Sequence, residues 1–321
     1  MRESTRRSSK QPCDRIPRSG RRWSAASWTA ILLLPCALTA QADVHLNPVI
    51  AKLAAGEVVY GLSTQDLSLS YAREVARAPA DFVYVDMEHS PMDFPALRIF
   101  LLAMGDKQAI LRKANAQPNL SLLARFAPPA LESEWVVKQA LDLGLYGILF
   151  NGVDTREQAE FAVSTMRYPQ LRDSRYPEPR GIRGASAANA AWAWGVSGAE
   201  YTRRADLWPL NPEGDLLAVM MIETVEGLRN LDAIASTPGV GALFPGAGGD
   251  LSRSLGVTRG TPELEQAFQQ ILAACLRHDV ACAITANSGE DVARRVREGW
   301  RIIRTTVAGA DAGRAILGDG L

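Results

Sequence analysis

The chain has 321 residues, with 35 basic and 35 acidic side chains and 47% hydrophobic residues. This composition is ordinary for a globular enzyme, and it excludes a disordered tail protein, a collagen-like fibre and a disulfide-stapled mini-domain. Eight basic but only two acidic residues fall within residues 1–42, so residues 43–321 carry a net charge of −6. An acidic body argues against nucleic acid as a partner, because nucleic-acid binding needs a basic face.

The first 42 residues have the pattern of a secretory signal peptide. A basic head ending at Arg22 precedes a short apolar run over residues 28–38, and residues 40–42 (Ala-Gln-Ala) supply the small side chains of a cleavage site. The apolar run is too short to span a bilayer, which takes about 20 residues. We expect cleavage before Asp43, export to the periplasm by a Sec or twin-arginine route, and no membrane contact afterwards. A retained membrane anchor is the alternative.

Short apolar or β-branched runs recur eight times after this segment, each followed by a helical pattern. They lie at residues 58–63, 81–88, 109–114, 146–152, 216–223, 240–246, 280–286 and 301–307. Near-continuous apolar strands that alternate with helices indicate a parallel sheet covered on both faces. Eight such units predict an α/β fold, a (β/α)8 TIM barrel, in one domain over residues 43–321. An open doubly wound sheet is the alternative, but it leaves two units unexplained.

Residues 167–215, between the fourth and fifth predicted strands, break this rhythm. They are rich in Arg, Tyr, Pro and Gly. Long connections at the C-terminal end of barrel strands often form lids or subunit contacts. We therefore expect residues 167–215 to form a lid or a subunit contact.

Two of the four cysteines remain after the predicted signal peptide. Cys275 lies on the apolar face of a helix predicted to begin at Pro262, and Cys282 lies in the next predicted strand. We expect two separate buried thiols. A disulfide is the alternative, which an oxidising compartment would permit.

Polar side chains gather at the ends of the predicted strands, and strand ends form the reactive face of such a barrel. They are Asp86, Glu88 and His89 after the second strand, Arg112 in the third, Glu223 ending the fifth, and Asp250 behind the glycine-rich turn of the sixth. Alternation places Asp86 and Glu88 on one side of their strand. Each residue alone could be structural, as a loop histidine, half of an ion pair or a helix cap. Together, at neighbouring strand ends, they predict a catalytic site.

These residue types suit metal-assisted chemistry on a 2-oxo acid. Glu223 and Asp250 make a poor zinc site but a good site for Mg²⁺ or Mn²⁺, which prefer oxygen ligands and keep open positions. A 2-oxo acid could fill those positions, and the metal would then stabilise an enolate. Arg112 would add positive charge at the same oxygen, and His89, oriented by Asp86, would act as the base.

Other mechanisms lack the residues they require. A Schiff-base aldolase needs a lysine inside the barrel. After the signal peptide only four lysines remain, and none lies beyond residue 138. Neither the G-x-S-x-G elbow of serine hydrolases nor a G-x-x-x-x-G-K-[ST] phosphate loop occurs.

Three segments carry a family resemblance: DFVYVDMEHSPMDF, MIETVEGLRNLDAIASTPGVGALFPGAGGDLSRSLG and RYP…RGIRGASAANAAWAWG. They resemble the HpcH/HpaI family of class II pyruvate aldolases, of the 2-dehydro-3-deoxyglucarate and 4-hydroxy-2-oxoheptanedioate type, over roughly residues 47–315. The resemblance implies a TIM barrel of the phosphoenolpyruvate/pyruvate type, assembled as a homo-oligomer (hexamer or trimer). It also implies cleavage of a 4-hydroxy-2-oxo acid to pyruvate and an aldehyde, with Mg²⁺, Mn²⁺ or Co²⁺ as cofactor.

The resemblance also implies roles for individual residues. Glu223 and Asp250 would be the metal ligands, Arg112 would contact the pyruvate oxygen, and His89 with Asp86 would form the base. Glu88 would have a structural role beside these residues. Met221 and Gly249 fall at substrate-contacting positions, and Met221 stands where family members commonly carry a glutamine near pyruvate.

Two other functions stay open. One keeps the barrel and the metal site but acts on another substrate, as in citrate-lyase-like or acyl-CoA lyases. The other is an exported binding relative without catalysis, which the departure at Met221 would favour.

Overall fold

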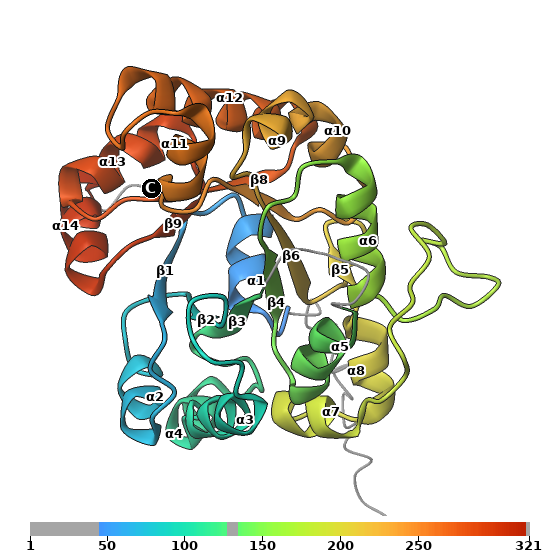
Figure 1. Cartoon of the computed structure of the whole chain (residues 1–321). Helices are drawn as coiled ribbons and strands as arrows, with labels where there is room; N and C mark the ends of the chain where they lie inside the picture. Colours follow the sequence, from blue (N-terminus) through green and yellow to red (C-terminus); the bar gives the residue numbers. More distant parts are fainter. Residues whose placement is uncertain (1–44, 127–133, 319–321) are drawn as a thin grey trace, which may run out of the picture. The chain divides into compact units, whose positions relative to one another are not determined.

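The structure, a computed structural model, describes residues 45–126 and 134–318, so the predicted signal peptide lies outside the described residues (Figure 1). Eight parallel strands close into a barrel in the order β1–β2–β3–β4–β6–β7–β8–β9, with β9 pairing with β1 and β4 with β6. The barrel strands are β1 (Val59–Thr64), β2 (Phe82–Asp86), β3 (Ser121–Phe126), β4 (Gly147–Phe150), β6 (Leu216–Met221), β7 (Ala242–Phe244), β8 (Ala281–Thr285) and β9 (Ile302–Arg304). The predicted (β/α)8 barrel is confirmed.

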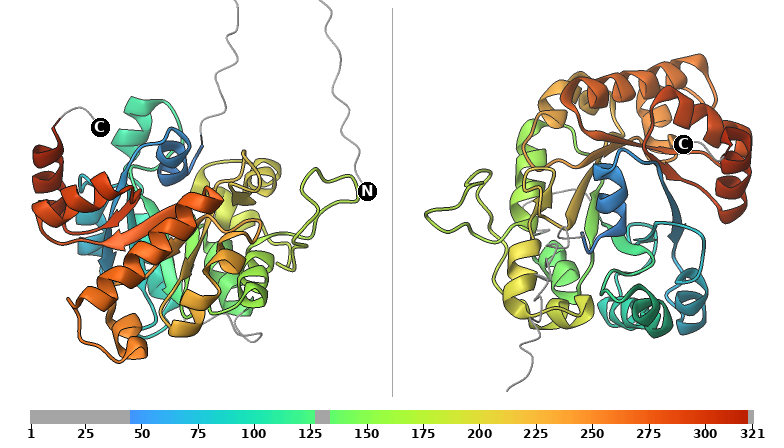
Figure 2. Two further views of the ribbon diagram at one scale, coloured as in Figure 1. Left: turned by 90° about the horizontal axis from the view of Figure 1, so that it is seen from above. Right: turned by 180° about the vertical axis from the view of Figure 1, so that it is seen from behind.

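Helices surround the barrel and connect its strands. They are α1 (Pro48–Ala54), α2 (Leu69–Val75), α3 (Phe94–Ala103), α4 (Lys107–Lys113), α5 (Glu134–Leu143), α6 (Arg156–Met166), α7 (Ala188–Trp194), α8 (Gly198–Arg204), α9 (Val225–Arg229), α10 (Leu231–Ala235), α11 (Gly249–Leu255), α12 (Pro262–His278), α13 (Gly289–Glu298) and α14 (Val307–Leu317). In the right-hand view of Figure 2, α1 lies across the middle of the barrel. Of the described helices, none is both long enough and apolar enough to cross a membrane.

The predicted third strand is wrong. Residues 109–114 belong to helix α4, which begins after Asp106, whose side chain accepts hydrogen bonds from the backbone N–H groups of Gln108 and Ala109. Leu111 on this helix is 79% exposed, which a central barrel strand would not allow. The third strand is instead β3, residues 121–126, in which every residue is buried. A strand buried on both faces is expected to be almost uniformly apolar, and this segment fits that pattern better.

The long connection between β4 and β6 is partly helical. It holds α7, α8 and the two-residue strand β5 (Leu207–Trp208), which pairs with β6. Trp194 of α7 stacks on Tyr146 with 4.5 Å between ring centroids and donates a hydrogen bond to the Gly144 carbonyl at 2.7 Å. Arg183, fully buried, lies over the Tyr168 ring and donates to Asp142 at 2.9 Å. This part of the connection is therefore fixed against the outside of the barrel.

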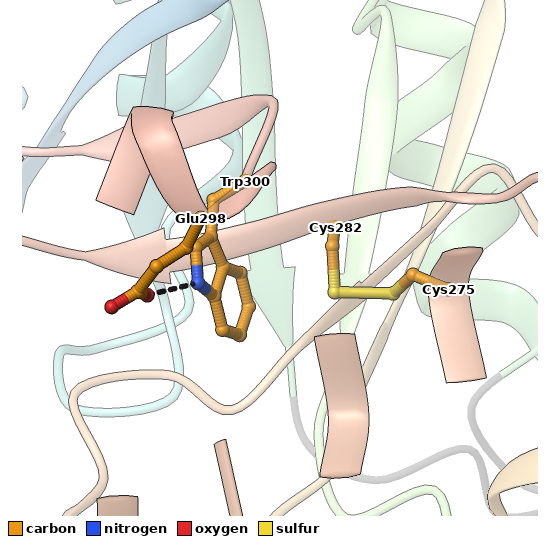
Figure 3. Close-up of a disulfide and its surroundings, with 4 residues drawn as sticks. All are labelled: Cys275, Cys282, Glu298 and Trp300. Carbon is orange, nitrogen blue, oxygen red and sulfur yellow. Dashed lines mark hydrogen bonds between the residues drawn. A yellow bond between two sulfur atoms is a disulfide. The ribbon is translucent and has the colours of Figure 1, made fainter. Parts of the chain in front are cut away.

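The two cysteines form a disulfide, so the prediction of separate thiols is wrong (Figure 3). Helix α12 is followed by Asp279, whose left-handed conformation (φ 52°) turns the chain directly back into β8. The turn brings the Cα atoms of Cys275 and Cys282 to 5.7 Å, within the ordinary range for a disulfide. Both residues are buried.

Candidate active site

The barrel interior is apolar along most of its length and becomes polar at the C-terminal ends of its strands. Inward side chains such as Tyr84, Leu123 and Val219 form one buried cluster, which Val49 and Ile50 of α1 join. Because side chains alternate along a strand, the polar residues that continue this inward row are Ser63, Asp86, Arg125, Asn151, Glu223, Thr285 and Arg304. Such a ring at the C-terminal ends is the expected place for catalysis in this fold.

Asp86 and Arg125 form the strongest contact of this ring. They are register partners on β2 and β3, and Arg125 Nε donates to Asp86 Oδ1 at 3.0 Å, while Nη2 donates to Oδ2. Burial by itself raises the pKa of Asp86, but the hydrogen bond and charge of Arg125 outweigh it, so the pKa of Asp86 is lowered on balance. Asp86 is therefore a fixed negative charge at neutral pH.

His89 and Glu88 complete a cluster around this pair. Asp86, Glu88 and His89 each have one side-chain atom that could bind a metal ion, and these three atoms all lie within 4.8 Å of one another. His89 Nδ1 lies 3.2 Å from Asp86 Oδ2 and 2.6 Å from Arg125 Nη2, so it donates to Asp86 when it carries a proton and accepts from Arg125 when it does not. Arg125 Nη1 also lies 3.2 Å from Glu88 Oε2. The His89 side chain is 55% exposed, so its ring is open to a substrate at the mouth.

The structure does not bring Arg112 to this cluster. The prediction placed Arg112 inside a strand, but it lies on the exposed surface of α4, outside the barrel. The guanidinium that contacts Asp86, Glu88 and His89 is that of Arg125. The role predicted for Arg112 therefore has its structural counterpart at Arg125, on the true third strand.

Glu223 and Asp250 reach the same mouth from the opposite part of the barrel. Glu223 follows β6, is buried, and accepts a hydrogen bond from the Gly152 N–H at 3.1 Å. Asp250 is the second residue of α11 and is exposed. Burial raises the pKa of Glu223 to about 7, and the negative charges of Asp250 and Glu88 add to this rise. Glu223 therefore lies within electrostatic range of both Asp250 and Glu88.

Met221 and Gly249 flank these carboxylates. Met221 is buried, and its Cε would lie 3.0 Å from a Cβ added at Gly246, so its side chain packs under the turn that leads to Asp250. A Cβ at Gly249 would lie 2.2 Å from Arg259 Nη2, so this position is crowded by a guanidinium.

Of the seven ring residues, the sequence prediction named Asp86 and Glu223 and missed five, of which Arg125 and Asn151 are the most informative. Arg125 was overlooked because its strand was misplaced, although alternation from Leu123 places it inward. Asn151 is buried after β4, and among the described residues neither polar atom of its amide has a hydrogen-bond partner. A buried amide without a hydrogen-bond partner lowers the stability of the fold. The position of Asn151 at a strand end is the sequence signal that could have marked it as a candidate site residue.

Comparisons with known proteins identify the family of the chain. The family model described as HpcH/HpaI aldolase/citrate lyase matches residues 62–314. The chain is 30% identical over 274 residues to a 5-keto-4-deoxy-D-glucarate aldolase of Escherichia coli O9:H4 (strain HS), covering 84% of this chain and 93% of that protein. A protein of the same name from Salmonella paratyphi C (strain RKS4594) is 29% identical, with 83% and 91% covered.

The comparison with solved structures identifies the same family. An HpcH/HpaI aldolase/citrate lyase family protein from Burkholderia cenocepacia J2315 has a TM-score of 0.67 and 27% identity, covering 84% of this chain and 98% of that one. The matched residues include the whole ring at the mouth of the barrel, from Ser63 to Arg304. The chain therefore belongs to the HpcH/HpaI aldolase/citrate lyase family and is a lyase of the aldolase type.

Proposed function

We propose that this protein is a class II aldolase that cleaves a 4-hydroxy-2-oxo acid to pyruvate and an aldehyde, with a divalent cation as cofactor. One observation carries the proposal: at the barrel mouth the negative charges of Asp250 and Glu88 act on the buried Glu223, and Arg125 and Asp86 hold His89. The names of the curated relatives, 5-keto-4-deoxy-D-glucarate aldolase, support an oxo-acid substrate.

The acidic residues fit a hard divalent cation such as Mg²⁺ or Mn²⁺. These ions prefer carboxylate oxygens, and the negative charges of Asp250 and Glu88 add to the cost of ionising the buried Glu223. A cation would remove that cost, because it neutralises the buried charge of Glu223. We assign Glu223 and Asp250 as its ligands. When bound, the cation supplies positive charge that withdraws electrons from the keto group of a 2-oxo acid.

The chain's own residues perform the proton transfers. In cleavage, His89 takes the proton of the C4 hydroxyl, the aldehyde carbonyl forms, and the C3–C4 bond breaks. The electron pair of that bond moves into the enolate of pyruvate, whose oxygen Arg125 stabilises with its positive charge. The protonated His89 then returns its proton to carbon C3, directly or through water, which gives pyruvate and restores the neutral base. Asp86 acts through His89 by orienting its ring.

We also propose that the protein is exported and works as a homo-oligomer. The Cys275–Cys282 disulfide supports an oxidising compartment. Ile99, Leu102 and Leu111 are 56%, 41% and 79% exposed on α3 and α4, and such apolar surface supports a subunit contact. Fractionation of the producing cells and light scattering of the purified protein test the two proposals separately.

Pyruvate release from a panel of 4-hydroxy-2-oxo acids tests the activity, with Mn²⁺, Mg²⁺ or a chelator in the assay. We expect turnover only with a cation, and its loss in the Glu223→Gln variant. Glu226→Gln is the matched control, because Glu226 is an exposed glutamate on the neighbouring helix α9. Equal pyruvate release with and without chelator, or turnover of acyl-CoA esters alone, would contradict the proposal.

A further inference from the structure

Asn151 is the ring residue that lies between the two sides of the proposed pyruvate site. It directly follows β4, which pairs with β3 on one side and with β6 on the other. Strand β3 carries Arg125, and Glu223 follows β6. Leu149 of β4 belongs to the interior cluster, so alternation turns Asn151 inward as well. Its side chain therefore enters the mouth between the guanidinium assigned to the enolate and the carboxylate assigned to the cation.

The backbone after Asn151 contacts the proposed cation ligand directly. Gly152 has a left-handed conformation (φ 55°), and its N–H donates to Glu223 Oε2 at 3.1 Å. Asn151 and Met221 are the next residues beyond the last register pair of β4 and β6. Met221 is apolar and fully buried, so β6 offers the amide no strong hydrogen-bonding group at this level. Asn151 is thus fixed beside the proposed ligand, and its neighbour on β6 leaves it unbonded.

The amide of Asn151 is buried and has no partner. The residue is 2% exposed, and in the part of the chain that the structure describes, neither Nδ2 nor Oδ1 takes part in a hydrogen bond. The barrel interior behind it is lined by apolar side chains such as Leu123, Leu149 and Val219. A buried amide without a partner costs free energy, and its presence in a native protein calls for an explanation. The direction from which a partner can come is the mouth of the barrel.

Asn47 shows how the same side chain is used where it serves the fold. It is also completely buried, but it lies at the opposite end of the barrel, as the cap of α1. Its Nδ2 donates to two backbone carbonyls, and its Oδ1 accepts from a backbone N–H and a hydroxyl. The partners are Tyr146, Asp215, Val49 and Ser121. Asn151 makes none of the corresponding bonds, so support of the fold does not explain its amide.

We propose that Asn151 binds the carboxylate of the 2-oxo acid, by donating a hydrogen bond from Nδ2 to one of its oxygens. This inference rests on the proposed aldolase function and adds a substrate-binding residue to the same site. A carboxylate only accepts hydrogen bonds, and Nδ2 carries two N–H donors. A neutral donor is sufficient there, because Arg125 and the cation supply the positive charge. A bond from a buried amide to a charged oxygen is also among the stronger hydrogen bonds.

Binding of pyruvate to the protein in the presence of Mn²⁺, measured by calorimetric titration, tests this role. We expect Asn151→Ala and Asn151→Leu to weaken pyruvate binding roughly 10- to 100-fold, because each loses a hydrogen bond to a charged group. Binding of Mn²⁺ alone, followed by the paramagnetic resonance of the free ion, should stay at the wild-type value, since Glu223 and the Gly152 N–H remain. Asn47→Ala is the matched control and should leave the pyruvate affinity unchanged.

Thermal unfolding without substrate separates binding from a structural role. Leu has nearly the branched shape of Asn, so Asn151→Leu removes an unpartnered amide without leaving a cavity. We expect it to raise Tm, whereas Asn47→Ala should lower Tm because it removes a fully bonded amide. A lower Tm in both Asn151 variants, with unchanged pyruvate affinity, would assign the amide to the fold and overturn the inference. Equal losses of Mn²⁺ and pyruvate binding would also overturn it, because Asn151 would then act through Glu223.

Exchange of the pyruvate methyl protons with deuterated water, followed by NMR, reports on the aldolase function itself. Metal-dependent exchange in the wild-type protein, with full pyruvate affinity in both Asn151 variants, would overturn the role of Asn151 and leave the aldolase function standing. Absence of such exchange in the wild-type protein would overturn the aldolase function and this inference with it.

Discussion

Asp86 and Arg125 face each other as register partners at the ends of neighbouring strands, and Arg125 Nε donates a hydrogen bond to Asp86 Oδ1 at 3.0 Å. This contact links the two kinds of chemistry that the proposed reaction needs. In that proposal the guanidinium supplies positive charge for an enolate oxygen, and the carboxylate, which contacts His89, orients it as the base. Because both side chains are mostly buried, their geometry is set by the barrel itself.

Arginine substitutions test which guanidinium serves the site. We expect Arg125→Gln to lower kcat/KM for pyruvate release by about 100-fold or more, because it removes the charge at the enolate oxygen and frees Asp86 and His89. Arg112→Gln should leave the kinetics unchanged, since Arg112 lies on the exposed helix α4. Steady-state kinetics of the two variants give the comparison. A larger loss in Arg112→Gln than in Arg125→Gln would refute the assignment.

The contrast between these two arginines shows what the sequence could and could not reveal. Most strands were predictable, because central barrel strands are short, apolar and regularly spaced. Residues 109–114 also contain an apolar run, but a single sequence does not reveal which side of a segment meets water. Asp106 as a helix cap was the local signal that favoured a helix. Because one strand was misplaced, the prediction assigned to Arg112 the role that we propose for Arg125.

Contacts between distant segments were less predictable than the strands. Glu223 and Asp250 could be proposed because both follow strands of the same barrel. That the amide of Asn151 has no hydrogen-bond partner among the described residues could not be predicted, because only the folded chain shows which groups surround it. The disulfide likewise depends on the left-handed turn at Asp279, which is unusual for a residue with a side chain.

Asp86→Asn tests whether Asp86 acts through His89. We expect kcat to fall roughly 100-fold, because the neutral amide no longer favours the protonated, correctly oriented imidazole. The KM for the substrate should change little. In a His89→Gln background the same substitution should cost little more, since two residues that act as a unit are not additive. Full additivity in this double-mutant cycle would show that Asp86 acts independently of His89.

Glu223 gives the metal-free protein a distinctive pH dependence. Its pKa is raised to about 7, chiefly by burial, so the folded state holds a proton that the unfolded state has lost. This contribution to the free energy of unfolding is fully present below about pH 4.5, falls as the pH rises, and is gone above about pH 7. Urea unfolding at several pH values, with chelator present, measures the fall. Glu223→Gln should remove this component.

Metal addition should reverse that loss. A divalent cation needs the ionised carboxylate, so Mn²⁺ should stabilise the wild-type protein more at pH 8 than at pH 5. The same addition should stabilise Glu223→Gln much less. Equal stabilisation of both proteins by Mn²⁺ would place the cation elsewhere.

The Cys275–Cys282 disulfide closes a short loop, with a sequence separation of 7 residues. Loop-closure entropy predicts that reduction costs about 2 kcal/mol of unfolding free energy. Urea unfolding of the protein from residue 43 onward, with and without reductant, measures this cost. The Cys275→Ala/Cys282→Ala double variant should be insensitive to reductant, which makes it the control. Because the proposed export places the chain in an oxidising compartment, protein recovered from the periplasm should contain no thiol that reacts with an alkylating agent after unfolding. Two reactive thiols in that material would contradict both the bridge and its proposed link to export.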